Sequence, residues 1–230
     1  MDPVEYVEIA RAESERGELV LRERRDEGAA PALELRANGV FVMDTVETST
    51  ERALAAAALA LVEEPREVVV GGLGLVFTMR EVLADRRVER CAVVEIEQAL
   101  VDWMRDGTVP HGPALLADER VVVVTADVAA ALAEAGPASY DLVLLDVDNG
   151  PGYLVHEQNA GLYTTAFLSV AAATLRPGGA LVVWSADAAP ELEAALREAV
   201  GNAEARPLAV RLQERDEQYW LYVARVPSAA

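Results

Sequence analysis

A run of β-branched residues that ends abruptly in glycines constrains the fold of this chain more than any other feature. The segment at residues 67–78 reads EVVVGGLGLVFT. A continuous valine run is typical of a strand buried on both faces, as in a parallel sheet. Glycine lets the backbone turn sharply and come close to a bound ligand. The segment therefore predicts a strand, a tight turn and a helix, with Gly72 and Gly74 beside a ligand.

Short apolar runs alternate with helical segments from residue 66 onward. The predicted strands are residues 68–70, 91–94, 121–124, 142–145 and 181–183. The predicted helices are residues 76–85, a segment ending near 105, a segment ending near 135, then 161–175 and 190–200. Residues 207–212 and 219–223 form a closing antiparallel hairpin around a short polar turn. This alternation predicts an α/β fold with a mostly parallel sheet, which binds ligands at the carboxyl ends of its strands.

The N-terminal part has a different pattern. Residues 18–24 and 32–36 alternate apolar and charged side chains, as half-buried antiparallel strands do, and Asn38-Gly39 predicts a tight turn into residues 40–43. An alanine-rich helix follows at 52–62, with Ser49 or Thr50 as its cap. We expect an N-terminal β-strand segment at 1–48 and an α/β domain at 49–230.

The charge balance excludes several classes of protein. The chain carries 39 acidic and 20 basic residues, a net charge of −19, which argues against nucleic-acid or anionic-membrane binding. All the basic residues other than histidine are arginine, so Schiff-base and phosphate-loop lysine chemistry are excluded. Cys91 is the only cysteine and has no partner for an internal disulfide. Residues 1–5 lack a signal-peptide pattern and no apolar run approaches the ~20 residues of a membrane span, which predicts a cytoplasmic protein.

Acidic residues follow the second and third predicted strands. Glu95 lies 23 positions after Gly72, where a carboxylate that accepts hydrogen bonds from both ribose hydroxyls is found, although a surface acid at a strand end is the alternative. Asp127 follows the third strand. It suits the amino group of an adenine or the N-cap of the next helix, and one residue can serve both.

The fourth predicted strand ends in Asp146, Asp148, Asn149 and a Gly-Pro turn. Two acids in one loop repel each other and can raise one pKa, which suits a general base. Such a loop could also bind a metal or an ammonium group, or be an acidic turn stabilised by its own backbone.

The order of these motifs resembles the spermidine synthase (polyamine aminopropyltransferase) family, within the class I S-adenosylmethionine-dependent methyltransferase fold. The glycine turn, VEIE at 94–97, TAD at 125–127, LDVDNGP at 145–151, LRPGG at 175–179 and REVL at 80–83 carry the resemblance over nearly the whole chain. It implies a Rossmann-like, mostly parallel seven-stranded sheet with a closing antiparallel hairpin, preceded by a small N-terminal β segment. It also implies a role in polyamine biosynthesis and a homodimer.

The resemblance assigns roles to matching residues. Gly72 and Gly74 would face the nucleoside, Glu95 would hold the ribose and Asp127 would contact the adenine. Asp146 matches the aspartate that deprotonates the attacking amine. The implied co-substrate is S-adenosylmethionine or its decarboxylated form, with a small, amine-type acceptor and no metal.

Several positions depart from the family pattern. Leu75 stands in place of the glycine-loop aspartate, Val42 in place of a ligand-binding glutamine and Glu51 in place of a tyrosine, and Trp184 replaces a polar residue. Since the aspartate helps to bind the aminopropyl ammonium, these changes predict an amine half of the pocket that is more apolar than in the family.

The remaining polar candidates lie in loops. His111 and His156 lack neighbouring Cys or His ligands in the sequence, which predicts no metal site. The segment that follows Asp146 would form a lid carrying His156 and Tyr153, with Asp148, Asn149 and Tyr163 as substrate-binding residues.

The predicted function is aminopropyl transfer from an S-adenosylmethionine-type nucleoside to an amine, with Asp146 as the base. Methyl transfer to a small molecule and nucleoside binding without catalysis are the alternatives. A dinucleotide-dependent oxidoreductase is a further one, because a glycine turn with a strand-end acid also suits NAD.

Overall fold

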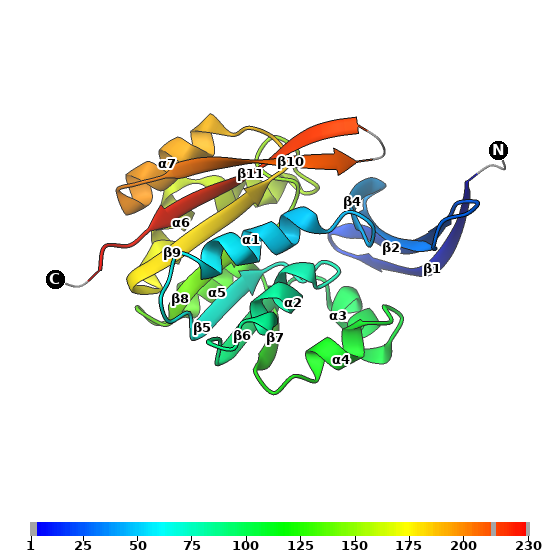
Figure 1. Cartoon of the computed structure of the whole chain (residues 1–230), viewed down its shortest axis with the longest axis horizontal. Helices are drawn as coiled ribbons and strands as arrows, with labels where there is room; N and C mark the ends of the chain where they lie inside the picture. Colours follow the sequence, from blue (N-terminus) through cyan, green and yellow to red (C-terminus); the bar gives the residue numbers. More distant parts are fainter. Residues whose placement is uncertain (1–3, 213–214, 229–230) are drawn as a thin grey trace.

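The computed structural model describes residues 4–212 and 215–228 and contains two β-sheets. One is a four-stranded antiparallel sheet of N-terminal strands, and the other is a seven-stranded sheet that carries helices on both faces (Figure 1). Residues 1–3, part of the segment expected to lack a signal peptide, lie outside the described residues. Residues 213–214 of the predicted closing turn lie outside them as well. The predicted α/β class, the mostly parallel sheet and the preceding β segment are confirmed.

The N-terminal sheet has the order β1-β2-β3-β4. Its strands are β1 (Glu5–Ser14), β2 (Gly17–Arg25), β3 (Ala32–Ala37) and β4 (Val40–Asp44). Strand β1 was not predicted from the sequence. This edge strand is exposed along most of its length, so it lacks the alternation of a half-buried strand, and its pairing with β2 shifts register between Glu8 and Ala10.

The large sheet has the order β10-β11-β9-β8-β5-β6-β7. Its strands are β5 (Glu67–Gly71), β6 (Arg90–Glu95), β7 (Val121–Thr125), β8 (Tyr140–Leu145), β9 (Leu175–Ser185), β10 (Glu204–Leu212) and β11 (Arg215–Arg225). Strands β5 to β9 run parallel, and β11 runs antiparallel to β9 and β10, which is the predicted closing hairpin. The chain leaves β5 on one side toward β6 and returns on the other side as β8. The strand order therefore reverses between β5 and β8, where a ligand crevice forms in such sheets.

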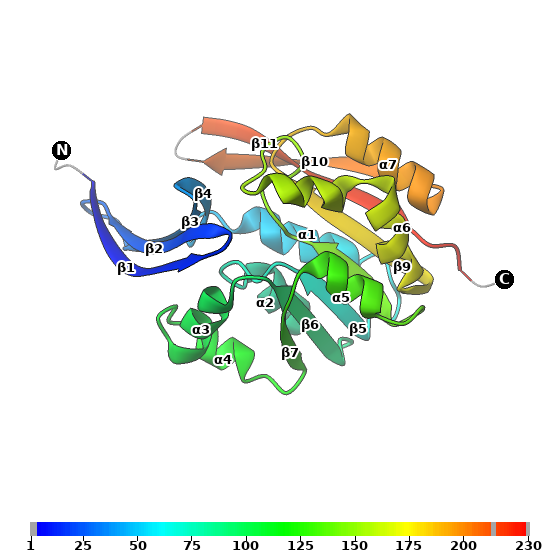
Figure 2. The same cartoon turned by 180° about the vertical axis from the view of Figure 1, so that it is seen from behind.

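Helices cover both faces of the large sheet. Figure 1 shows α1 and α2 in front of it, and Figure 2 shows α5, α6 and α7 on the opposite face. The helices are α1 (Ser49–Leu59), α2 (Phe77–Ala84), α3 (Gln98–Asp106), α4 (Gly112–Leu116), α5 (Val128–Glu134), α6 (Thr165–Ala173) and α7 (Pro190–Val200). Both layers bury fully apolar strands such as Val68–Val70, which explains the uninterrupted valine run.

Four local predictions were wrong. The short helix α4 lies within the predicted loop 106–119, and the predicted helix at 161–175 is split into a 3₁₀ helix, η1 (Glu157–Tyr163), and α6. Strand β9 begins at Leu175 and includes the Pro-Gly-Gly segment, because Leu175 pairs with Tyr140 of β8 and the Val226 N–H donates to Gly179 O. Thr48, rather than Ser49 or Thr50, occupies the N-cap of α1, without a side-chain capping bond.

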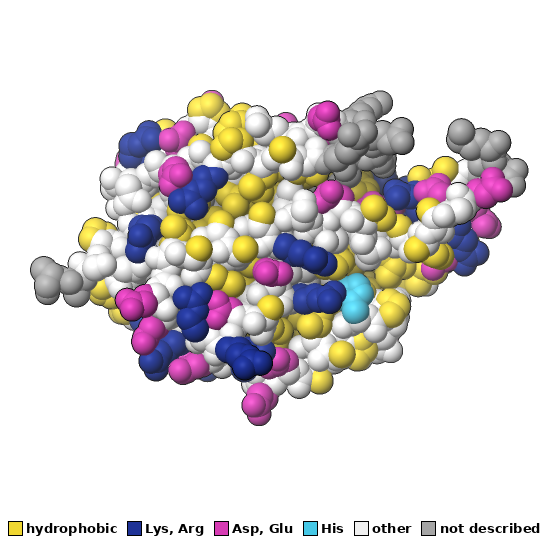
Figure 3. All heavy atoms as spheres, in the orientation of Figure 1, with side chains coloured by type: hydrophobic (Ala, Val, Ile, Leu, Met, Phe, Trp, Pro, Cys, Tyr) yellow, Lys and Arg dark blue, Asp and Glu magenta, His cyan; other side chains and the backbone are white. Residues whose placement is uncertain are grey.

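One hydrophobic cluster joins the two sheets. Leu21 and Leu35 of the N-terminal sheet belong to the same cluster as Leu54 of α1 and Val70 of β5. The expected division at residue 48 falls between β4 and α1, and as a domain boundary it stays a prediction. Figure 3 shows arginines scattered among acidic side chains on the face that it draws, with no single basic patch there.

Candidate functional site

The glycine turn after β5 contacts the end of β8. Gly72 has a φ of +97°, and a Cβ at this position would lie 2.1 Å from the carbonyl oxygen of Asp146. The turn is held by the Gly72 N–H, which donates to Val94 O at 2.9 Å, and by the Asp146 N–H, which donates to Gly71 O at 2.8 Å. Only glycine fits there, and the contact brings Asp146 to the point where the strand order reverses.

The second half of the turn packs against the N-terminal sheet. A Cβ on Gly74 would lie 2.7 Å from Met43 Sδ, and the Leu75 N–H points at the same sulfur at 3.1 Å. The Leu75 side chain is fully buried in the core. The position at which the family carries an acid is thus apolar in this chain and faces the protein interior.

A first cavity of about 140 Å³ lies at the carboxyl ends of the strands. Its walls come from both sheets and from the segment after β8. Residues that line it include Leu19, Leu35 and Val42 of the N-terminal sheet, Gly72 and Gly74, Glu95, Ile96, Asp127, Asp146, Asp148, His156 and Asn159. Five of the predicted cofactor and catalytic residues therefore meet around one cavity.

Glu95 lies in the wall of this cavity with only 8% of its surface exposed. One carboxyl oxygen accepts the Leu73 N–H at 2.9 Å and the other accepts the Glu97 N–H at 2.8 Å. Each oxygen keeps a second lone pair for a ligand hydroxyl. Burial raises the pKa of Glu95, and the backbone N–H donors oppose this rise.

Asp127 and Asp148 both support local backbone. The Asp127 carboxylate caps α5 by accepting the N–H groups of Ala129 and Ala130, and its other oxygen stays available at the cavity. Asp148 has a φ of +64° and accepts the Asn149 and Val155 N–H groups and the Asn159 amide. Asp148 thus orders the segment that covers the cavity, as the alternative interpretation of this loop anticipated.

Asp146 combines burial with access to the cavity. Its carboxylate accepts a hydrogen bond from the Thr78 hydroxyl at 2.5 Å. Burial raises the pKa of Asp146 from 3.8 to about 6, although the Thr78 hydrogen bond lowers it. A carboxyl group with a pKa near 6 is ionised at neutral pH and is a stronger base than an ordinary aspartate, which suits proton abstraction.

A second cavity of about 170 Å³ adjoins the first, since Val42 lines both. Its lining is Phe41, Val42, Met43, Asp44, Glu47, Thr50, Glu51, Asn149, Tyr153, Trp184, Ala186, Asp187 and Tyr219. Four of these residues are acidic and three are large aromatics with a polar group. The expectation of a more apolar amine half stays a prediction. Leu75 is apolar, but carboxyl groups from β4, α1 and the segment after β9 supply negative charge that spacing in the sequence did not reveal.

The segment after β8 contributes to both cavities. His156 lines the first cavity, whereas Tyr153 and Asn149 line the second. Tyr163 is buried and donates its hydroxyl to Val147 O at 2.8 Å, and it lines neither cavity. His111 bonds Leu75 O at 3.0 Å and packs on Phe77, away from the cavities.

Arg16 is a lining residue that was not predicted from the sequence. It lies in the turn between β1 and β2, its Nε is 3.5 Å from Glu97 Oε1, and its Nη2 donates to Asn159 Oδ1 at 3.3 Å. Because the turn is far in sequence from the glycine loop and contains no recognisable motif, local patterns carry no signal for this residue.

Among residues 4–212 and 215–228, no three His, Cys, Asp or Glu side chains group as metal ligands. Within the same ranges, no helix combines the length and the apolar character needed to cross a bilayer.

The strand order, the glycine turn and the strand-end acid define a Rossmann-like domain of the class I methyltransferase type. The sequence-family model described as the spermine/spermidine synthase domain matches residues 47–208, which make up most of the Rossmann-like part of the chain. The chain belongs to the spermine/spermidine synthase family.

Curated relatives include both aminopropyl and methyl transferases. Polyamine aminopropyltransferase 2 of Pseudomonas aeruginosa is 34% identical over 125 residues, which cover 53% of this chain and 34% of the relative. Putrescine N-methyltransferase 3 of Nicotiana tabacum is 32% identical over 123 residues, 53% of this chain and 30% of the relative. The matched segment thus spans about a third of either relative.

Solved structures share the fold. A spermidine synthase in complex with the transition state analogue AdoDATO has a TM-score of 0.80 at 17% identity and covers 95% of this chain and 73% of that chain. The spermidine synthase of Thermotoga maritima has a TM-score of 0.77 at 17% identity, with 95% of this chain and 72% of that chain covered.

Proposed function

We propose that this protein transfers an aminopropyl group from a sulfonium nucleoside, bound in the first cavity, to an amine acceptor in the second. The observation that carries the proposal is the position of Asp146, a largely buried carboxylate with a raised pKa that lines the same cavity as Glu95 and the glycine turn. The family membership and the aminopropyltransferase relative support it.

The first cavity suits the nucleoside. Glu95 offers one free lone pair on each oxygen to the two ribose hydroxyls, and Gly72 leaves no side chain between the ligand and the turn. Asp127 keeps one carboxylate oxygen for the adenine amino group. When bound, the nucleoside supplies a carbon activated by the positive sulfur.

Asp146 would make the acceptor reactive. An ammonium has no lone pair, so its proton must first pass to the Asp146 carboxylate, which becomes a neutral carboxyl. The freed lone pair then forms the new N–C bond while the C–S bond breaks and its electron pair returns to sulfur. Asp146 finally loses its proton to solvent. The second cavity, with its four carboxyl side chains, favours a cationic acceptor.

Methyl transfer is the second candidate, and two observations favour it. Leu75 replaces the family acid and is fully buried, so it offers no charge to an aminopropyl ammonium. Putrescine N-methyltransferases are among the relatives. Roles for Asp148, Asn149 and Tyr163 in substrate binding, assembly as a homodimer and a cytoplasmic location stay predictions.

Product analysis tests these proposals. The protein is incubated with S-adenosylmethionine or its decarboxylated form together with short diamines. Release of methylthioadenosine from the decarboxylated nucleoside supports aminopropyl transfer, and release of S-adenosylhomocysteine supports methyl transfer. Nucleoside binding without either product would favour a non-catalytic homologue, and binding of NAD instead would favour an oxidoreductase.

A further inference from the structure

One carboxyl group in the second cavity is buried without a cationic partner. Glu51, in the first turn of α1, is 8% exposed and lines the cavity. Its carboxyl group accepts a hydrogen bond from the Thr50 hydroxyl at 3.1 Å, and none of the ion pairs among the described residues includes it. Burying a carboxylate without a cation is costly, so this position favours any ligand that brings a positive charge.

The other carboxyl groups of the cavity have different surroundings. Asp44 lies 3.5 Å from Arg24 and accepts the Val46 N–H, so its charge is already compensated. Glu47 accepts the Ser49 N–H at 2.8 Å, and Asp187 is exposed to solvent. Glu51 is therefore the buried acid of this cavity whose charge is left for a ligand.

Thr78 links Glu51 to Asp146. Its hydroxyl donates to Asp146 Oδ2 at 2.5 Å and also lies 3.3 Å from the backbone carbonyl oxygen of Glu51. Burial and the nearby charge of Asp146 raise the pKa of Glu51 to about 7. Asp146 lines the first cavity and Glu51 the second, and Val42 lines both. The two carboxyl groups thus line adjoining cavities, one on the proposed nucleoside side and one on the proposed acceptor side.

We propose that Glu51 binds the cationic acceptor and holds its reacting nitrogen against Asp146. The acceptor class is a primary alkylammonium, and this inference rests on the proposed function. Asp146 takes one proton from the ammonium, while Glu51 accepts a hydrogen bond from a remaining N–H and so directs the lone pair toward the first cavity. In this chain a carboxylate thus binds the acceptor where the family pattern has a tyrosine.

Calorimetry with a defined probe tests the role of Glu51. The protein is saturated with methylthioadenosine and titrated with 1,4-diaminobutane, for wild type, Glu51→Gln and Glu51→Asp. We expect Glu51→Gln to weaken diamine binding at least ~10-fold, the scale of one charged hydrogen bond. The affinity for methylthioadenosine should stay within about twofold, a split that general loss of structure would not produce. Glu51→Asp keeps the charge and should recover part of the diamine affinity.

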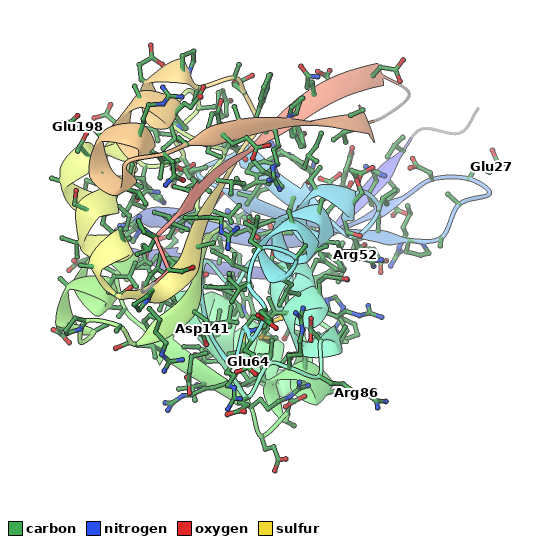
Figure 4. The ribbon with its side chains drawn as sticks, turned by 60° about the vertical axis from the view of Figure 1, so that its left-hand side comes forward. Glu27, Arg52, Glu64, Arg86, Asp141 and Glu198 are labelled. Atoms are coloured by element: carbon green, nitrogen blue, oxygen red, sulfur yellow. The ribbon has the colours of Figure 1, made fainter. Side chains whose placement is uncertain are left out.

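Glu64→Gln is the matched control for net charge. Figure 4 shows Glu64 beyond the end of α1, away from Arg52 near its start, and Glu64 is exposed and pairs with Arg66. The Glu64→Gln protein should bind the diamine with the affinity of wild type.

Equal diamine affinity in Glu51→Gln and wild type overturns the role of Glu51 and leaves the transfer reaction intact. A wild-type protein that binds no amine and turns over none overturns both proposals. If Glu51→Gln does not fold, Glu51→Ala replaces it as the variant without the carboxylate, and unchanged diamine affinity together with unchanged kcat in Glu51→Ala overturns the inference.

Discussion

Replacing Asp146 with asparagine removes the proposed proton acceptor and keeps nearly the same shape. The pKa of Asp146 rises from 3.8 in the unfolded chain to about 6 in the folded protein because the carboxyl group is buried. A folded-state pKa above the unfolded value means that folding disfavours the charged form. Asp146 therefore lowers stability as the pH rises from about 4 to about 6, and the full loss is present above that range.

The size of this effect follows from the two pKa values. Their difference of about 2 corresponds to about 3 kcal/mol. We expect Asp146→Asn to be more stable than wild type by up to about 3 kcal/mol near pH 8, and by about half of that near pH 5. In a chain of this length the larger value corresponds to a rise in melting temperature of roughly 6–12 °C. Loss of the charge also removes repulsion on Glu51, which acts in the same direction.

Urea unfolding, monitored by circular dichroism between about pH 5 and pH 8, measures this difference in stability. Turnover should fall at least ~100-fold in Asp146→Asn, because the proton acceptor is lost. Asp148→Asn is the control from the same loop. Its carboxylate accepts three N–H donors, so an amide there should lower stability by ~1–3 kcal/mol. An Asp146→Asn protein that is less stable than wild type near pH 8, or a difference that does not shrink toward acid pH, would contradict a raised pKa of Asp146 in the folded protein.

Four further predictions follow from single positions. Gly72→Ala should lower the free energy of unfolding by on the order of 3 kcal/mol or more in urea titrations, because its Cβ would meet Asp146 O; a loss under about 1 kcal/mol contradicts the close approach. Glu95→Gln should weaken methylthioadenosine binding ~10–100-fold by calorimetry while the circular dichroism spectrum is kept, and unchanged affinity would remove Glu95 from the nucleoside site. Tyr222→Phe leaves the buried Ala189 N–H without its acceptor and should cost ~1–3 kcal/mol in thermal unfolding, so an unchanged melting temperature argues against this bond. Burial raises the pKa of the Cys91 thiol to about 12, so iodoacetamide should label the unfolded but not the native chain, and rapid native labelling would contradict the burial.

Several features of the fold were predictable because their signals are local. The valine run before Gly72 predicted a buried parallel strand, and the alternation beyond it predicted the layered α/β architecture. The strand ends also placed Glu95 and Asp146 at one edge of the sheet, since parallel strands end on the same side. Local signals failed for β1, an exposed edge strand, and for the start of β9, whose pairing partner lies far away in the sequence.

The order of the elements and the acids at the strand ends could be predicted from the amino-acid sequence, because periodicity, glycine turns and chain direction are properties of neighbouring residues. The surroundings of those acids, in contrast, depend on how distant segments pack together. Glu51 and Asp146 are 95 positions apart and share Thr78 only because α1 packs beside α2 on the sheet. A raised pKa in the strand-end loop was predicted from repulsion between Asp146 and Asp148, but burial is what raises the pKa of Asp146. Burial and the approach of distant charges depend on the packing, so this cause and the acidic second cavity have no signature in the sequence.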